Sequence, residues 1–455
     1  MSREVAFAVV STVALGIVFA VSIIVGSGAT LVLSLLPLFV LFVVTVSNFE
    51  LAVFLLLGML FVDVHYASFS SAVWYSLPFG LSFLVRYKGL DWKEFDTPLN
   101  RPIFIYGLCV LPSFFNAMLP FVSALALFNV LAFLIAFYAM VISIRRREDL
   151  RTLLIFYLVL TALNSFDVLR LVLSANKRVF GFSGIMFVDY SALAVCLAAV
   201  IGIISKGKVR ALAVLMSVLF AIALVLTRTR NTWFSALITL GITGIYILFH
   251  PEIIGVSRRR AFVAIVSIYV LIIGCGAAFI LLNRGIEQRA TQFSAQTGPA
   301  IDESGKVENS FVSRMLIWDT AINAFRAHPV IGIGVYAFPY SSKFYYRIPR
   351  FLYTRYVEGL SPHQTHLAVL CETGVVGAIA FFLFIIAALK TAYRGVSRAV
   401  EEQSRKDALI AAVAVTYCTV SMIFTDAWLW GQGIVLLGLI LGLTVANRNI
   451  AMQTE

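Results

Sequence analysis

Two histidines, His363 and His366, stand immediately before a long apolar run that contains Glu372. Histidine can accept a proton near neutral pH with little tuning, so a histidine at the top of a membrane helix is a candidate general base. We prefer His363 because it stands further from the apolar run, and we expect His366 to share its helix face and orient it. Glu372 lies roughly 13 Å further along a helix, so we predict that it hydrogen-bonds within the bundle instead.

Two arginines occupy a short turn, residues 227–232, between two apolar runs. Arginine binds phosphate groups through paired N–H donors, so Arg228 and Arg230 are candidate ligands of an anion. In the alternative interpretation, they reach lipid phosphates or pair with acidic residues near the same helix ends. The acidic candidates for such pairing are Asp63, Asp167, Asp189 and Asp426.

Residues 310–329 predict an amphipathic helix, because apolar residues recur at positions 311, 315, 318, 322 and 325. Ser310 can cap its start and Pro329 forces its end. At about 100° per residue, Arg314 falls at the flank of the apolar stripe. A helix lying on the outer leaflet would hold Arg314 at headgroup depth, which is the depth of a lipid diphosphate.

Aromatic and basic residues alternate over residues 340–356, where Arg347 and Arg350 stand among seven aromatic side chains. The simpler interpretation is an interfacial aromatic belt with cations that bind headgroups. Sugar stacking or diphosphate binding is the alternative. Neither a D-x-D or H-E-x-x-H motif nor a nucleotide-binding glycine loop occurs, so we expect no metal and no other cofactor.

These residues must be positioned by membrane helices, because 61% of the 455 residues are hydrophobic and only 13% are charged, which excludes a soluble globular enzyme. Continuous apolar runs favour helices over the strands of a membrane barrel. We therefore predict an all-α, polytopic integral membrane protein with one domain over residues 1–455 and about 14 transmembrane helices. The expected spans are residues 5–24 (a retained helix), 28–46, 49–65, 69–85, 102–119, 121–144, 152–172, 187–205, 211–227, 232–249, 261–283, 365–389, 408–426 and 429–446.

Basic residues set the expected orientation. If the N-terminus is cytoplasmic, the inside segments hold 21 of the 35 lysines and arginines, and the short outside loops hold five. Residues 284–364 then form one long extracytoplasmic loop. The net charge of +12 follows from this topology, so we expect the lipid bilayer and no nucleic acid as a partner. The five cysteines lie in apolar runs as small core residues, and the glycine pairs Gly374/Gly377 and Gly438/Gly442 predict close helix packing.

Three stretches, taken together, resemble the O-antigen ligase and polymerase superfamily over residues 211–390. They are Arg228-Thr-Arg230-Asn-Thr-Trp233, then Arg314-x-x-x-Trp318 with His328-Pro329-Val-Ile-Gly332-Ile-Gly334, and His363-x-x-x-Leu367 with Glu372-Thr-Gly374 and Gly377. The first half of the chain matches only as generic membrane helices. Gln364 stands where the family commonly has asparagine, and threonines replace the serine before the family's arginine, which leaves Arg228 or Arg230 as its equivalent.

The resemblance implies a GT-C-like, inverting glycosyltransferase of the inner (plasma) membrane, with its active site facing the periplasm or the cell exterior. It implies an undecaprenyl-diphosphate-linked glycan as donor, and the lipid A core or another lipid-linked glycan as acceptor. His363 would take the proton of the acceptor hydroxyl, and Arg228, Arg230 and Arg314 would stabilise the departing diphosphate. The further candidate substrate-binding residues are Trp318, Arg347, Arg350 and His366.

Two questions stay open at this point. The motifs are shared by ligases, which transfer a glycan to the lipid A core, and by polymerases, which extend a glycan on its lipid carrier. A flippase for lipid-linked oligosaccharides, or another transporter, is the alternative from a different class. A transporter would place charges near the bilayer midplane and often shows paired repeats. Here the charges gather at the outer rim and in one loop, which favours the transferase.

The charge distribution makes a direct prediction about topology. A cysteine introduced at Ser304 should react with a membrane-impermeant thiol reagent in intact cells, and a cysteine at Ser404 should not. The opposite labelling pattern would overturn the proposed orientation and, with it, the assignment of the site.

Overall fold

The computed structural model describes residues 92–117, 119–175, 181–227, 229–253, 261–267, 310–429 and 431–453, with scattered positions between 53 and 80 and between 255 and 274. The α-helices are α5 (Asn100–Val110), α6 (Pro120–Ser143), α7 (Arg147–Ala175), α8 (Phe187–Ile204), α9 (Gly207–Leu226), α10 (Arg230–Phe249), α13 (Ser310–Ala327), α14 (Phe338–Ser341), α15 (Arg350–Tyr356), α16 (Thr365–Arg398), α17 (Glu402–Ser421) and α18 (Gly431–Gln453). The short elements are β1 (His65–Tyr66), β2 (Phe69–Ser70), η1 (Trp92–Phe95), η2 (Leu111–Asn116), η3 (Gly181–Met186), η4 (Pro251–Ile253), η5 (Ser342–Phe344) and η6 (Ala427–Leu429).

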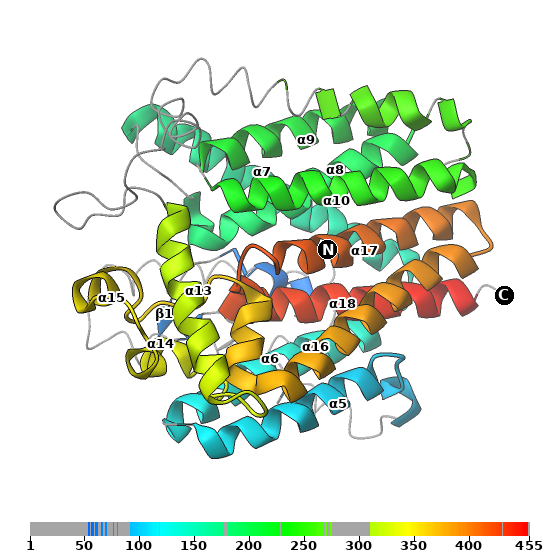
Figure 1. The fold of residues 1–455 in the computed structure, drawn as a ribbon. Helices are drawn as coiled ribbons and strands as arrows, with labels where there is room; N and C mark the ends of the chain where they lie inside the picture. The colour runs from blue at the N-terminus through cyan, green and yellow to red at the C-terminus, as the bar shows by residue number, and fades with distance from the viewer. Residues whose placement is uncertain are drawn as a thin grey trace, which may run out of the picture.

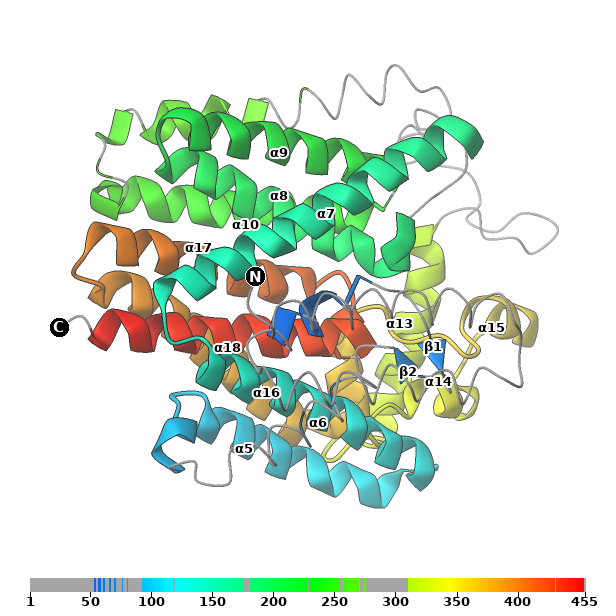
Figure 2. The same cartoon turned by 180° about the vertical axis from the view of Figure 1, so that it is seen from behind.

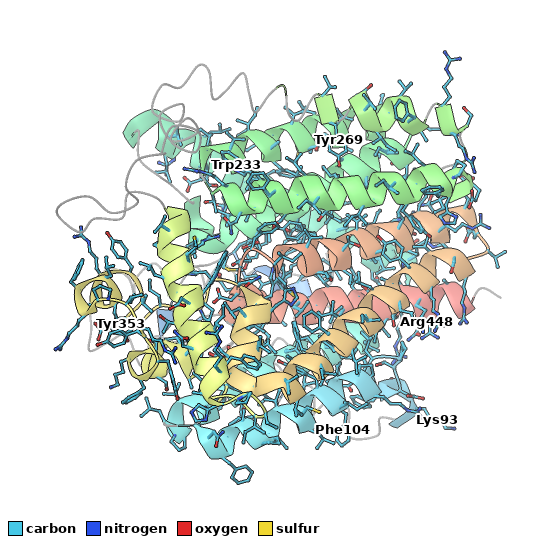
Figure 3. All side chains as sticks on the ribbon, in the orientation of Figure 1. Lys93, Phe104, Trp233, Tyr269, Tyr353 and Arg448 are labelled. Carbon is cyan, nitrogen blue, oxygen red and sulfur yellow. The ribbon has the colours of Figure 1, made fainter. Side chains whose placement is uncertain are left out.

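The long helices form a bundle with two different ends (Figures 1 and 2). At one end lie α13, α14 and α15, which belong to the predicted extracytoplasmic loop, and at the other lies the C-terminus. Figure 3 shows Lys93 and Arg448 at the end opposite to Tyr353. The structure therefore separates basic turns from the loop that carries the candidate site, as the charge distribution predicts.

Seven of the described helices are long and apolar enough to cross a membrane, which confirms a polytopic helical protein. They are α6, α7, α8 with the end of η3, α9, α10, α16 and α18. The predicted span 102–119 is instead the short α5 followed by η2, in which Pro112 stands. The antiparallel strand pair β1–β2 lies at the predicted connection between spans 49–65 and 69–85. Spans 5–24 and 28–46, and most of 261–283, lie outside the described residues.

Small residues allow the closest helix contact, which joins α6 and α18. A Cβ atom on Gly438 would lie 2.6 Å from the carbonyl oxygen of Phe133, and one on Gly442 would overlap that of Phe137. Close packing at this glycine pair is confirmed. Among the cysteines, Cys196, Cys371 and Cys418 are buried and Cys109 is half-buried, all as free thiols, while Cys275 lies outside the described residues.

Helix α16 bends sharply at Gly374, whose φ of 67° lies in the left-handed region. His366 and Phe382 would be about 24 Å apart along a straight helix. Their ring centroids are in fact 5.1 Å apart, because residues 365–373 fold back against residues 375–398. The predicted span 365–389 lies within Thr365–Arg398, a candidate membrane span by length and composition, but the structure shows that this helix is interrupted at Gly374.

Residues 310–364, which we call the external segment after their predicted position, supply the groups that fill the break in α16. At the bend the last carbonyls of one half and the first N–H groups of the other lose their helical partners. The chain from Pro329 to Gly334 replaces these partners, with Ile333 N–H donating to the carbonyl of Cys371 (3.1 Å) and Val375 N–H donating to that of Pro329 (2.8 Å). The bonds from Gly334 to Glu372 and from Val376 to Val330 complete this crossing of backbones (3.0 and 3.3 Å).

Glycines make the crossing possible. A Cβ on Gly332 would overlap the backbone of Glu372, and one on Gly374 would overlap that of Val330. The Gly374/Gly377 pair was predicted to pack helix against helix. Gly374 instead receives the external loop, and a Cβ on Gly377 would overlap the side chain of Thr373 in the same helix.

Substituting these glycines tests the crossing. Gly332→Ala or Gly374→Ala should lower the free energy of unfolding by more than about 2 kcal/mol, because the added methyl group meets backbone that cannot yield. Gly359→Ala is the matched control, since its φ is 75° but its Cβ would meet nothing within 4 Å. It should cost only about 1 kcal/mol. Equal thermal unfolding midpoints for the three variants in detergent would contradict this account.

The structure indicates a better position than Ser404 for the cysteine that is predicted to be cytoplasmic. Ser404 is buried, and its hydroxyl accepts a hydrogen bond from Arg147, so a cysteine there would be shielded from either side. Lys208, near the start of α9, is exposed and lies in a segment predicted to be cytoplasmic. A cysteine at Lys208 therefore reports on orientation where one at Ser404 reports on burial.

Candidate functional site

His363 lies in the loop between α15 and α16, in the left-handed backbone conformation with φ of 54°. Its backbone N–H donates to Oδ2 of Asp426 at 3.0 Å, and its Nδ1 lies 3.9 Å from Oδ1 of the same carboxylate. The His363 side chain is 42% exposed, whereas that of Asp426 is only 8% exposed. The imidazole is thus held from behind by a buried carboxylate and open on another side.

The start of α16 and the end of α17 bring this pair together. Thr365 N–H donates to the carbonyls of Met422 and Thr425, and its hydroxyl donates to the carbonyl of Thr425 at 2.6 Å. Asp426 follows directly, in the turn before η6. Asp426 was considered in the sequence only as a partner for arginines. Asp426 and His363 are 63 residues apart in the sequence, so their contact cannot be read from local spacing. The feature of the sequence that points to Asp426 is its acidic side chain in an otherwise apolar region.

Helix α13 carries Arg314 and Trp318 to the same place. Trp318 Nε1–H donates to the carbonyl of Pro362 at 3.1 Å, which fixes α13 against the loop that bears His363. Arg314 lies one turn earlier and is close enough to act electrostatically on both His363 and Asp426. The structure therefore joins three of the predicted site residues, His363, Arg314 and Trp318, around Asp426.

Charges around His363 oppose one another. Burial lowers the pKa of His363, the nearby Asp426 carboxylate raises it, and Arg314 lowers it, with a net shift below the ordinary histidine value. The pKa of Arg314 is also lowered by burial, against the attraction of Asp426. At neutral pH His363 is consequently neutral and able to accept a proton.

The predicted helix over residues 310–329 is confirmed as α13, but its buried face differs from the predicted stripe. Ile317, Ala321 and Ala324 are buried, whereas Met315 and Ile322 of the predicted stripe are exposed. The buried face belongs to a small external core with Phe338 and other residues of the loop. The helix packs on that core because alanines allow close approach, and no pattern within the helix itself reveals which face has a partner.

Arg230 is the first residue of α10, and three residues later Trp233 Nε1–H donates to the carbonyl of Leu224 in α9 at 3.0 Å. This end of α10 lies at the same end of the bundle as α13 (Figures 1 and 3). Arg228 lies outside the described residues. Arg347 and Arg350 are exposed, just before α15 and at its start, and the structure records no ion pair that links them to the His363 cluster among the described residues.

His366 and Glu372 play parts that differ from those expected. His363 precedes α16, so it shares no helix face with His366, whose ring stacks on Phe382 at an interplanar angle of 10°. Glu372 is buried, and its carboxylate accepts backbone N–H bonds from Tyr336 (2.9 Å) and Phe338 (3.3 Å) in the external segment. The expectation that Glu372 bonds within the membrane bundle is wrong, because the bend of α16 turns it towards the loop.

The remaining predicted pairings also resolve differently. Asp167 pairs with Arg170 at 2.7 Å, and Asp189 accepts a hydrogen bond from Tyr417 at 3.0 Å. Asp63 lies outside the described residues. The 340–356 segment is only partly an exposed belt, because Tyr353 is buried and stacks on Tyr346 with ring centroids 4.1 Å apart.

The fold and the site define a polytopic helical membrane protein that presents a histidine, an aspartate and an arginine together at one end of its bundle. Within the described part of the chain, no three histidine, cysteine or acidic side chains gather as metal ligands. Residues 211–382 match the family model described as O-antigen ligase, which confirms the predicted recognition over this segment and supports glycosyl transfer in general. No curated protein matches the chain.

The electrostatics of the cluster can be tested without an activity. Asp426→Asn should lower the pKa of His363 further, because it removes the charge that favours the protonated ring while its amide oxygen can still accept the backbone N–H. Arg314→Gln should raise the pKa of His363 by removing a repulsive charge. NMR titration of isotope-labelled histidine measures both shifts, with the signal of His250 at the other end of the bundle as control. Unchanged His363 titration in both variants would contradict the arrangement.

Proposed function

We propose that the protein is a metal-independent, inverting glycosyltransferase that moves a glycan from undecaprenyl diphosphate to an acceptor sugar. The observation that carries the proposal is the grouping of His363, Asp426 and Arg314 within and beside a segment that matches the O-antigen ligase family. The resemblance supplies the donor, the acceptor and the GT-C-like class. The proposed site faces the periplasm or the cell exterior from the inner membrane.

His363 acts as the general base in this proposal. Its neutral imidazole accepts the proton of the acceptor hydroxyl, the oxygen attacks the anomeric carbon, and the bond from that carbon to the diphosphate oxygen breaks. A single displacement from the face opposite the leaving group inverts the anomeric centre. Asp426 stabilises the imidazolium that forms and holds the backbone of His363, so it acts as a positioning residue.

Arginines stabilise the departing diphosphate. Arg314 is half-buried beside the base, and its lowered pKa reflects partial burial of its charge, which strengthens its attraction for an anion. Arg230, at the start of α10, together with Arg228, supplies the second part of the binding site. Diphosphate is a good leaving group, so the proposal needs no general acid. Trp318, Arg347, Arg350 and His366 are the further proposed substrate contacts.

Replacing the base is the central test. In detergent, where no compartments exist and transport cannot be scored, the purified protein should transfer a labelled glycan from undecaprenyl diphosphate to an acceptor. His363→Ala should still bind the donor, but its transfer rate should be lower by a factor of about 10² to 10⁴. The rate of the unaltered protein should fall as the pH drops through the pKa of His363, which lies below the ordinary value, because the protonated ring cannot accept a proton.

His250→Ala is the matched control, because His250 is exposed and follows the end of α10 that is opposite to Arg230. A dead His366→Ala variant beside an active His363→Ala variant would move the base to His366. Full activity of both would show that the histidines are structural, and donor binding without any transfer by the unaltered protein would favour the flippase.

Lysine substitutions test the arginines. Arg228→Lys, Arg230→Lys and Arg314→Lys keep the charge but lose the paired N–H geometry, so transfer should fall well beyond about tenfold while folding survives. Arg326→Lys is the matched control, since Arg326 is exposed in the last turn of the same helix as Arg314. Near-normal turnover of all three site variants would identify these arginines as interfacial anchors.

A further inference from the structure

A polar hollow lies at the end of the bundle opposite to His363. Its volume is about 550 Å³, and it lies between the end of α10 with η4, the last turns of α16, and the start of α17. Lys390, Arg394 and Arg405 line it, together with Tyr246, Tyr393 and His250. Among the described residues that line it, Glu252 alone is acidic, and it pairs with His250 at 3.1 Å.

Lys390 and Arg394 in this hollow differ from other basic residues at the same end of the bundle, which form ion pairs with carboxylates. Elsewhere at this end, Arg145 pairs with Glu94, and Arg147 and Arg151 pair with Asp407. Within the described part of the chain, neither Lys390 nor Arg394 forms an ion pair with a carboxylate. Arg448 of α18 also lies close enough to Arg394 and Arg398 for their charges to repel. Such a cluster of like charges is stabilised by an anion that binds among them.

One face of α16 continues from this hollow into exposed apolar surface. Leu383, Ile386, Lys390 and Arg394 follow at spacings of three and four residues, which places them in one stripe along the helix. Leu383 is 55% exposed and Ile386 is 57% exposed. The stripe therefore has apolar side chains at Leu383 and Ile386 and two cations at Lys390 and Arg394. This order matches a lipid, whose acyl chains are apolar and whose phosphate is anionic.

The depth of the hollow fits a headgroup. Arg394 lies about 29 Å along α16 from Val375, just beyond the bend at the outer end, and the hydrocarbon core is roughly 30 Å thick. Tyr246 and Tyr393 contact each other edge to face beside the hollow, with ring centroids 4.8 Å apart. Tyrosines with one polar end are typical of the membrane interface.

We propose that this hollow binds the phosphate of an anionic lipid in the leaflet opposite to the His363 site. Lys390 and Arg394 hold the phosphate, Arg405 closes the hollow while its guanidinium caps the carbonyls of Ala399 and Val400, and an acyl chain runs along Leu383 and Ile386. The site is separate from the proposed transfer reaction and does not depend on it.

The test compares lipid binding by two double variants of equal charge. Lys390→Gln/Arg394→Gln removes the two cations of the hollow, and Arg146→Gln/Lys208→Gln removes two exposed cations predicted to lie on the same face outside it. Full-length proteins in neutral phosphatidylcholine nanodiscs are titrated with phosphatidylglycerol, and bound lipid is counted by native mass spectrometry. We expect one phosphatidylglycerol to bind the unaltered protein and the control alike, and affinity in the hollow variant to fall by about tenfold or more.

Equal weakening in both double variants, or no preference for phosphatidylglycerol over phosphatidylcholine, would overturn the proposal. A parallel arm adds inorganic phosphate to the neutral nanodiscs and follows the thermal unfolding midpoint. In one outcome, phosphate stabilises the unaltered protein but not Lys390→Gln/Arg394→Gln, while mass spectrometry finds no bound phosphatidylglycerol. That result would overturn the lipid as the ligand and assign the hollow to a soluble phosphate compound. Stabilisation by phosphatidylglycerol alone, lost in the hollow variant, supports the lipid.

Discussion

Pairing of two backbones at the bend of α16 holds the external segment, residues 310–364, in place. A helix that breaks inside a membrane protein leaves carbonyl and N–H groups without partners, and these are costly to bury. The segment from Pro329 to Gly334 satisfies both sides of the break, while the Glu372 carboxylate holds the backbone of Tyr336 and Phe338. Membrane helix and external loop are therefore one unit, and the sequence pattern of glycines around them is a packing requirement.

The contacts around His363 are made by elements that adjoin this bend. The folded-back half of α16 presents His363 at its head, and bonds from Thr365 to the end of α17 place Asp426 behind the imidazole. The Trp318 indole joins α13 to the same loop, which sets Arg314 beside the pair. An imidazole, a carboxylate and a guanidinium thus come from the loop before α16, the turn before η6 and helix α13, three segments that lie far apart in the chain.

The two ends of the bundle handle charge differently. At the His363 end, a carboxylate and a guanidinium lie close to the imidazole and shift its pKa in opposite directions, as the proposed base requires. At the opposite end, most basic residues that start α7 and α17 are neutralised by acidic partners, and the hollow beside α16 concentrates the positive charge that remains. Some of the lysines and arginines at this end therefore form ion pairs at the starts of α7 and α17, whereas others line the hollow proposed to bind an anion.

The sequence by itself determined the helical membrane class, the family resemblance, the helix α13, and His363, Arg314 and Trp318 as candidate site residues. These follow from local composition, from helical periodicity and from motif spacing, which need no knowledge of distant contacts. Tertiary structure alone decided that α16 turns back at Gly374, that Asp426 supports His363, that Glu372 faces the loop and that α13 buries its alanines. Each of these depends on groups far apart in the chain, and a glycine in an apolar run gives no sign of whether a neighbouring backbone will occupy the space it leaves open.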